Sequence, residues 1–126
     1  IINNQCIPIY GDGKNIRDWL YVDDHILAID LIFHKSKIGK SYNIGGNNEI
    51  NNNEIANILI SKLDEKLNRK KGESIKLIKY VNDRLGHDRR YAIDSSKIEN
   101  ELGWSPKYTF EIGINKTIDW YLSNLL

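Results

Sequence analysis

Residues 82–94 read Asn-Asp-Arg-Leu-Gly-His-Asp-Arg-Arg-Tyr-Ala-Ile-Asp, and the predicted strands and helices are arranged around this charged connection. Its first nine residues hold five charged side chains and one histidine, directly after an apolar run. One interpretation is a solvated loop with internal salt bridges, each worth less than about 1 kcal/mol. The composition favours an anion site, because Arg84, the open backbone of Gly86 and His87 lie close together and suit a diphosphate.

Short apolar runs before this connection predict strands. Cys6–Tyr10 is expected to be an edge strand or a strand whose free side faces a ligand, because Pro8 has no N–H to donate to a ladder. The turn residues Gly11–Lys14 and the alternation along Ile16–Val22 predict a second strand that pairs with it as a hairpin. Two further strands are predicted, at Ser41–Ile44 and Ile75–Val81.

The longest predicted helix has Asp23 or Asp24 as its N-cap and continues to Gly39. It is apolar on nearly all sides, which predicts burial on more than one side and exposed apolar surface or self-association if the chain stands alone. The two carboxylates with His25 resemble an acid–base cluster, but carboxylates at a helix start are usually caps. Other predicted helix starts are a capping box of Asn51 and Glu54, a cap at Asp94 or Ser95, and a cap at Thr109. The helix that starts at Asp94 or Ser95 is expected to end at Leu102-Gly103. The expected core tryptophans are Trp19, Trp104 and Trp120.

The composition bounds the class of protein. With 126 residues, 40% of them hydrophobic, the chain predicts one domain of α/β class (α+β in isolation) with a small sheet and about four helices. A net charge of +1 disfavours nucleic acid as a partner, and no run reaches the roughly 18 apolar residues of a membrane span. The lone Cys6 agrees with a reducing compartment, so we expect a soluble cytoplasmic protein. The basic stretch Lys66–Lys71 is interpreted as a solvated loop. The histidines lack the spacing of metal ligands. The chain has no methionine, and its first residues resemble the interior of a longer protein, so we expect a fragment.

Three motifs have competing interpretations. Tyr10 and Lys14 have the Tyr-x-x-x-Lys spacing of short-chain dehydrogenases, but the glycines between them disfavour the helical turn that this catalytic pair needs. Neither Gly11-x-Gly13 nor Gly45-Gly46 has the third glycine of a dinucleotide fingerprint. Arg17 suits a cross-strand ion pair and a fork onto phosphate about equally.

Several segments together carry a family resemblance. They are Pro8–Gly13, Ile16–His25, Tyr42–Gly46, Asp83–Asp94, Glu101–Pro106 and Thr117–Tyr121. Together they resemble the C-terminal part of dTDP-glucose 4,6-dehydratases, and the likeness covers essentially the whole chain. The alternatives are another NAD-dependent nucleotide-sugar epimerase, dehydratase or decarboxylase, which shares the Tyr-Asn-Ile-Gly pattern, or a non-catalytic nucleotide- or phosphate-binding module. The Gly-His-Asp-Arg-Arg-Tyr run points to the dehydratases.

The resemblance implies a division of roles. In these extended Rossmann-type enzymes an N-terminal domain binds NAD and supplies the catalytic groups, while the C-terminal part holds the nucleotide sugar. Residues 1–126 therefore resemble the nucleotide-sugar-binding domain, with no catalytic, metal-binding or cofactor-binding residue of its own, and we expect it to be inactive alone. The full enzyme, implied to be a homodimer, oxidises C4 of dTDP-glucose, removes water across C5 and C6, and returns the hydride to C6.

Motif by motif, the resemblance also implies a substrate-binding set. Pro8–Tyr10 resemble the segment against the thymine, Arg17 resembles the arginine on the diphosphate, and Asn52 matches a polar substrate contact. Leu85 stands where the family usually has proline, which implies a less restricted loop. The full set is Pro8, Ile9, Tyr10, Arg17, Asn52, Asp83, Arg84, Leu85, Gly86 and His87.

Overall fold

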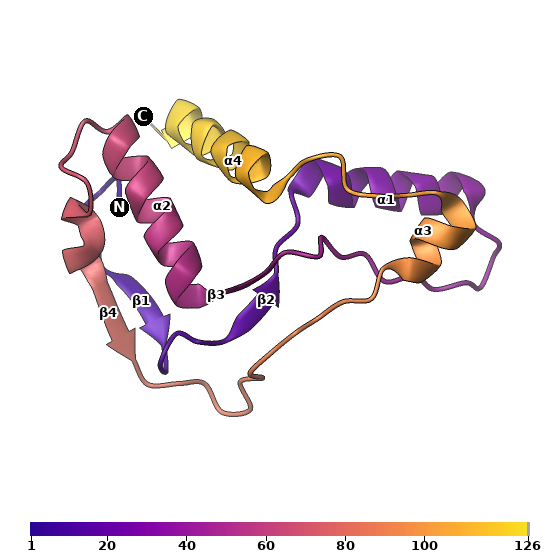
Figure 1. Ribbon diagram of the computed structural model, residues 1–126, viewed down its shortest axis with the longest axis horizontal. Coiled ribbons are helices and arrows are strands. Elements are labelled where there is room, and N and C mark those ends of the chain that lie inside the picture. The colour runs from indigo at the N-terminus through magenta and orange to yellow at the C-terminus, as the bar shows by residue number, and fades with distance from the viewer. Residues whose placement is uncertain (126) are drawn as a thin grey trace. The chain divides into compact units, whose positions relative to one another are not determined.

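The strand expected at Cys6–Tyr10 is present as β1 (Ile7–Tyr10), which pairs in parallel with β4 (Ile78–Val81). The register places Ile7 opposite Ile78 and Tyr10 opposite Val81, so the two strands end together. They lie side by side in Figure 1. Within residues 1–125, β4 is the only strand paired with β1, in agreement with the edge position predicted from its proline.

The predicted hairpin is wrong. β2 (Ile16–Asp18) pairs with β3 (Glu49–Asn51) in a second two-stranded sheet and does not pair with β1. The connection between β1 and β2 turns towards a helix start instead, where Asn53 N–H donates to Gly13 O at 3.0 Å. The Gly-rich turn therefore redirects the chain away from β1.

The computed structural model describes residues 1–125, which form two compact units. The first unit comprises Ile1–Arg17 and Ile50–Tyr91 and includes β1, β4, α2 (Asn52–Lys66) and the 3-10 helix η1 (Glu73–Leu77). The second comprises Asp18–Glu49 and the chain from Ala92 onward, with α1 (Val22–Lys35), α3 (Ser96–Leu102) and α4 (Phe110–Leu125). The prediction of an α/β chain with a small sheet and about four helices is confirmed. No helix in this part of the chain combines the length and apolar character of a membrane span.

Several predicted helix ends are confirmed. The Asn51 side chain accepts Glu54 N–H at 2.9 Å and the Glu54 carboxylate accepts Asn51 N–H at 3.4 Å, a reciprocal capping box for α2. Gly103 ends α3 with φ of +71°, a left-handed conformation that glycine adopts readily. Thr109 Oγ1 accepts Ile112 N–H at 3.3 Å at the start of α4.

The predicted cap of α1 is wrong. Tyr21 is the N-cap residue, without a side-chain hydrogen bond, and both aspartates lie in the first turn. Asp24 is fully buried, and its carboxylate accepts the backbone N–H groups of Lys107 at 2.9 Å and Tyr108 at 3.1 Å. The carboxylate thereby joins the start of α1 to the segment that precedes α4.

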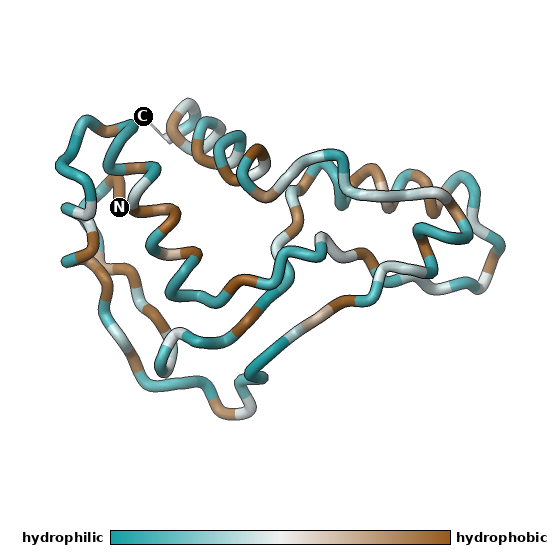
Figure 2. The backbone as a smooth tube through the Cα atoms, viewed as in Figure 1, coloured by the Kyte–Doolittle hydropathy of each residue, from teal (hydrophilic) through white to brown (hydrophobic). Residues whose placement is uncertain are grey.

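The predicted burial of α1 on more than one side is also wrong, whereas the expected exposure of apolar surface is confirmed. Ala28 packs with Ile98 and Trp104 in the core of the second unit, but Phe33 is 82% exposed. Figure 2 shows apolar residues recurring along α1. Trp104 is a core residue as predicted, but Trp120 is 60% exposed and is not.

No strand forms at Ser41–Ile44, where one was predicted. The amides that follow it bind a side chain, because the Asp18 carboxylate accepts Gly46 N–H and Asn48 N–H, each at 2.8 Å. The Asp18 carboxylate, not a neighbouring strand, therefore satisfies these two backbone N–H groups.

A buried carboxylate also closes the first unit. Ser74 donates to Asp64 from its hydroxyl at 2.5 Å and from its backbone N–H at 3.1 Å, and both residues are buried. The hydrogen bond from the Ser74 hydroxyl is the main reason that the pKa of Asp64 lies below its ordinary value of 3.8. The ionised form of Asp64 is therefore favoured by folding.

We expect Asp64 to make the free energy of unfolding depend on pH in the acid range. A carboxyl whose pKa is lowered by folding stabilises the fold above its unfolded pKa, and this contribution is lost as the pH falls through the folded value. Asp64→Asn should therefore flatten the pH dependence of the free energy of unfolding from about pH 5 downward, measured by urea unfolding at successive pH values. Glu65→Gln, at the exposed neighbouring residue, should keep the wild-type slope. An unchanged slope in Asp64→Asn would contradict the prediction.

Candidate functional site

The two connections that carry most of the predicted binding residues leave the same edge of the β1–β4 pair. Because the strands are parallel, Tyr10 and Val81 end together, and Gly11 N–H donates to Val81 O at 3.0 Å. Ligands of α/β proteins commonly bind beyond the carboxyl ends of parallel strands. We call residues 10–17 and 82–91 the edge site.

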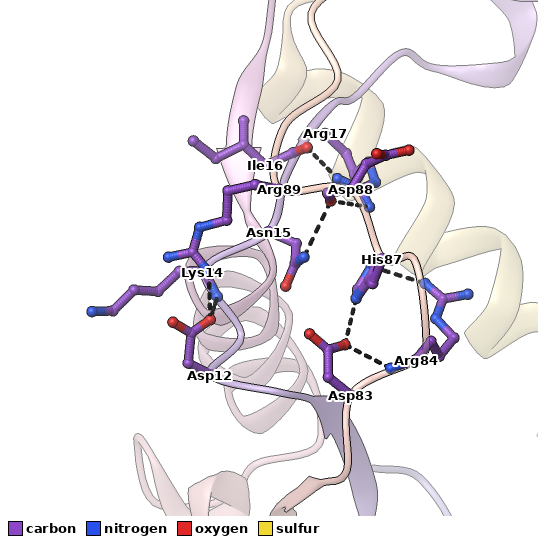
Figure 3. A network of polar contacts seen from close by, with 10 residues as sticks. All are labelled: Asp12, Lys14, Asn15, Ile16, Arg17, Asp83, Arg84, His87, Asp88 and Arg89. Atoms are coloured by element: carbon purple, nitrogen blue, oxygen red, sulfur yellow. Dashed lines mark hydrogen bonds and ion pairs between the residues drawn. The ribbon is translucent and has the colours of Figure 1, made fainter.

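Gly11 allows the two connections to approach closely. Its φ is +58°, and a Cβ atom at this position would lie 2.7 Å from Asp83 Oδ2. A side chain here would therefore displace the Asp83 carboxylate, which orients two groups of its own loop. Asp83 Oδ1 accepts His87 Nδ1–H at 2.6 Å and Arg84 N–H at 2.9 Å (Figure 3).

Arg84 extends this group to the end of β1. Its Nη2 lies 3.0 Å from His87 Nε2, and its guanidinium carbon lies 5.0 Å from the centre of the Tyr10 ring. A cation at this distance over an aromatic face is attracted by the ring electrons. Tyr10, Asp83, Arg84 and His87 therefore form one contact group.

Arg17 reaches the other part of the loop. Its guanidinium donates to Ile16 O at 2.6 Å and to Asp88 O at 3.1 Å, and it stacks over the Tyr91 ring at 4.4 Å from the centre. Asn15 Nδ2 donates to the same Asp88 carbonyl at 3.2 Å, as Figure 3 shows. Arg17 is therefore held beside the loop by backbone acceptors and an aromatic face.

The edge site has a mixed electrostatic character. The hydrogen bond from Arg89 lowers the pKa of Asp12, and the hydrogen bond from His87 lowers the pKa of Asp83, so both carboxyls favour the ionised form. The hydrogen bond from Tyr91 to Asp88 raises the pKa of the Tyr91 phenol, while Arg17 and Arg84 both act on it in the opposite direction. Both guanidinium groups therefore exert their charge on the same part of the loop.

Other members of the predicted set lie outside this contact group. Pro8 is exposed on β1 and Ile9 is buried beneath it. Asn52 begins α2, where its backbone N–H donates to Asn15 O at 3.2 Å. Two members form the exposed tip of the loop: Leu85, fully exposed, and Gly86, at φ of +70°.

The sequence reasoning missed Asn15. It is 1% exposed, it holds the Asp88 carbonyl, and its Oδ1 is the only buried side-chain polar atom without a hydrogen-bond partner in residues 1–125. The chain is rich in asparagine, so a single asparagine is hard to distinguish by type alone. The position of Asn15 two residues before Arg17 was the available signal.

Gly13 and Gly45 do not form a dinucleotide cradle, and Tyr10 and Lys14 are not arranged as a catalytic pair. A Cβ atom on Gly13 would lie 2.7 Å from Ile9 Cγ2, and one on Gly45 would lie 2.9 Å from Ile93, so both glycines face protein atoms. Tyr10 ends a strand, and the turn after it has positive φ at Gly11 and Gly13, so Lys14 is not placed one helical turn from Tyr10. In the described part of the chain, no three His, Cys, Asp or Glu side chains gather as a metal site.

Comparison with known proteins gives close matches over nearly the whole chain. The family described as GDP-mannose 4,6 dehydratase matches residues 1–117. A dTDP-glucose 4,6-dehydratase of Xanthomonas campestris pv. campestris is 52% identical over 119 residues, which are 94% of this chain and 34% of that protein. The chain thus spans about a third of the length of the curated relatives that it matches.

Solved structures show the same arrangement of the backbone. The dTDP-glucose 4,6-dehydratase of Bacillus anthracis str. Ames, in complex with NAD, is 48% identical with a TM-score of 0.79, covering 98% of this chain and 36% of that chain. The UDP-glucose 4-epimerase of Thermotoga maritima, with UDP-glucose, is 29% identical with a TM-score of 0.80, covering 99% and 37%. Both proteins are much longer than this chain.

Proposed function

The chain belongs to the GDP-mannose 4,6 dehydratase family, and on this basis we propose that it is the nucleotide-sugar-binding part of a dTDP-glucose 4,6-dehydratase. In this proposal residues 1–126 bind dTDP-glucose, and the whole protein, a cytoplasmic homodimer, converts it to dTDP-4-keto-6-deoxyglucose. The reaction is taken from the relatives of that name.

One observation carries the proposal: two arginines and an aromatic ring gather at the edge site. Arg17 and Arg84 supply two positive charges and planar sets of donors, which suit the oxygens of a diphosphate. Arg17 now contacts neutral carbonyls, and phosphate oxygens are stronger acceptors. Tyr10 is 41% exposed, so part of its ring is available to contact a base.

The remaining residues have supporting roles in this proposal. Pro8 and Ile9 shape the strand beside the base, and Asn52 offers a polar contact. Leu85 and Gly86, at the exposed tip of the loop, close over the nucleotide. Because Leu85 lacks the restricted backbone of the proline usual in the family, this closure costs more conformational entropy.

Catalysis is assigned to residues outside this chain. Gly13 and Gly45 pack against protein atoms, so NAD, which accepts and returns the hydride in this reaction, is proposed to bind elsewhere in the whole protein. Asp83 and His87 bond to each other and to Arg84, which gives them a role in binding and orientation.

Binding and turnover test the proposal separately. Protein made from the complete reading frame should bind dTDP-glucose by calorimetry, and dTDP should compete for the site. Thymidine, which lacks the diphosphate, should bind far more weakly because it gains nothing from the arginines. Residues 1–126 alone should give no turnover with dTDP-glucose and NAD. Equal affinity for thymidine, or turnover by the isolated chain, would contradict the assigned roles.

A further inference from the structure

His87 lies between the carboxylate of Asp83 and the guanidinium of Arg84, and little of its side chain is accessible to water. Its Nδ1 is 2.6 Å from Asp83 Oδ1, and its Nε2 is 3.0 Å from Arg84 Nη2. The His87 side chain is 5% exposed although the loop around it is largely exposed. Both ring nitrogens are therefore occupied within the loop (Figure 3).

The chemistry of these two partners fixes the position of the proton on His87. A guanidinium has only N–H donors, so Nε2 accepts from Arg84 through its lone pair. An ionised carboxylate only accepts, so Nδ1 carries the proton and donates to Asp83. The other neutral tautomer would place two donors against each other and two acceptors against each other. The contacts therefore require neutral His87 with its proton on Nδ1.

Asp83, which accepts the hydrogen bond from His87, is itself held in place. Asp83 Oδ1 also accepts Arg84 N–H at 2.9 Å, and its carboxyl group lies against Gly11, where a Cβ atom would come within 2.7 Å of Oδ2. The hydrogen bond from His87 lowers the pKa of Asp83, which keeps its carboxyl ionised and able to accept.

The Arg84 guanidinium is the last group in the row of contacts from Asp83 through His87. The bond to His87 uses one N–H, and the Tyr10 ring lies 5.0 Å from the guanidinium carbon. These two contacts fix the orientation of a long side chain on a loop whose next residue, Leu85, contacts nothing that buries it. Other N–H groups of the guanidinium remain to bind an anion.

We propose that His87 is a positioning residue, which acts as the neutral Nδ1–H tautomer between Asp83 and Arg84 and orients the Arg84 guanidinium for the diphosphate of the ligand. The role rests on the proposed nucleotide-sugar function. It also excludes His87 as a general base in this conformation, because the lone pair of Nε2 is already engaged by Arg84.

The tautomer can be measured without any ligand. A long-range ¹H–¹⁵N spectrum of the protein, labelled on histidine, should show His87 with a protonated Nδ1 and an unprotonated Nε2 at neutral pH. In Arg84→Ala the Nε2 resonance should move, because it loses its donor. A protonated Nε2 in the wild-type protein would overturn the proposal, whether or not the protein binds dTDP-glucose.

Substitutions at position 87 separate positioning from general folding. His87→Ala should weaken dTDP-glucose binding about tenfold, because the bond that orients a charged donor is lost. His87→Gln, whose Oε1 can accept near the position of Nε2, should recover most of that loss. His87→Asn, whose amide is one bond too short to reach Arg84, should not. Thermal unfolding of each variant identifies any that fail to fold.

A double-mutant cycle provides the decisive comparison. In an Arg84→Ala background, His87→Ala should have little further effect on affinity, because its role acts through Arg84. A full additional tenfold loss there, or a Gln variant as weak as the Ala variant, would overturn the positioning role. If the wild-type protein does not bind dTDP-glucose at all, the proposed function fails, and the tautomer measurement still decides the arrangement of the three side chains.

Discussion

Asp24→Ala is expected to lower the free energy of unfolding by about 2–5 kcal/mol, because it leaves two backbone N–H groups without their acceptor. The Asp24 carboxylate is fully buried, and it accepts Lys107 N–H at 2.9 Å and Tyr108 N–H at 3.1 Å. Alanine removes both bonds and leaves a small void. Since a domain is typically stable by only about 5–15 kcal/mol, this loss is a large part of the total.

Urea unfolding followed by circular dichroism measures this change. Asp24→Asn should lose less than Asp24→Ala, because its carbonyl can still accept one N–H while its amide opposes the other. Asp30→Ala is the matched control on the same helix: Asp30 is exposed and pairs only with His34, at 3.4 Å, so it should change stability by less than about 1 kcal/mol. Equal effects of Asp24→Ala and Asp30→Ala would show that the buried carboxylate does not stabilise the start of α1.

Arg17→Ala is expected to weaken the binding of dTDP-glucose by about 10- to 150-fold, which corresponds to about 1.5–3 kcal/mol for hydrogen bonds to a charged group. Arg17 donates to the carbonyls of Ile16 and Asp88 and stacks on Tyr91. A diphosphate replaces neutral acceptors with charged ones, so the side chain contributes more in the complex than in the free protein.

Calorimetry of two variants separates this contact from a general effect of charge. Arg89→Ala also removes one positive charge from the edge site, but Arg89 pairs with Asp12 at 2.8 Å with both side chains more than half exposed, so its loss should change affinity far less. Arg17→Lys keeps the charge without the planar fork and should be intermediate. Equal losses of affinity in Arg17→Ala and Arg89→Ala would show that Arg17 contributes only its charge.

The features predicted correctly from sequence depend on residues close together in the chain. The capping box needs only Asn51 and Glu54, and the end of α3 needs only Gly103. A short apolar run was enough to locate β1, although the strand that pairs with it is distant in sequence. Local hydrogen bonds explain the two helix ends.

The incorrect predictions concern residues whose partners are distant in sequence. Asp24 resembled a cap because a carboxylate near a helix start usually is one, and its acceptor role for Lys107 and Tyr108, more than 80 residues later, leaves no local pattern. Asp18 likewise accepts the N–H groups of Gly46 and Asn48, which follow the segment Ser41–Ile44 where a strand was expected. The hairpin was wrong because the pairing partner of β1 lies near residue 80.

The edge site shows the same division. Its arginines and histidine were found from the resemblance and from the charge of residues 82–94, but the contacts of Arg17 with Asp88 and Tyr91 depend on the approach of two connections. Asn15, which holds the Asp88 carbonyl, is marked in an asparagine-rich chain only by its position two residues before Arg17. The burial of Asn15 can be recognised only in the folded structure.

The parallel pairing of β1 with β4 has a consequence for the order of folding. Ile7 pairs with Ile78, so the two halves of the edge site meet only after a chain segment of about 70 residues has closed into a loop. Closure over such a distance is slow compared with the formation of a helix such as α2, which depends on local contacts. We therefore expect a refolding chain to regain helical signal well before it regains affinity for a nucleotide.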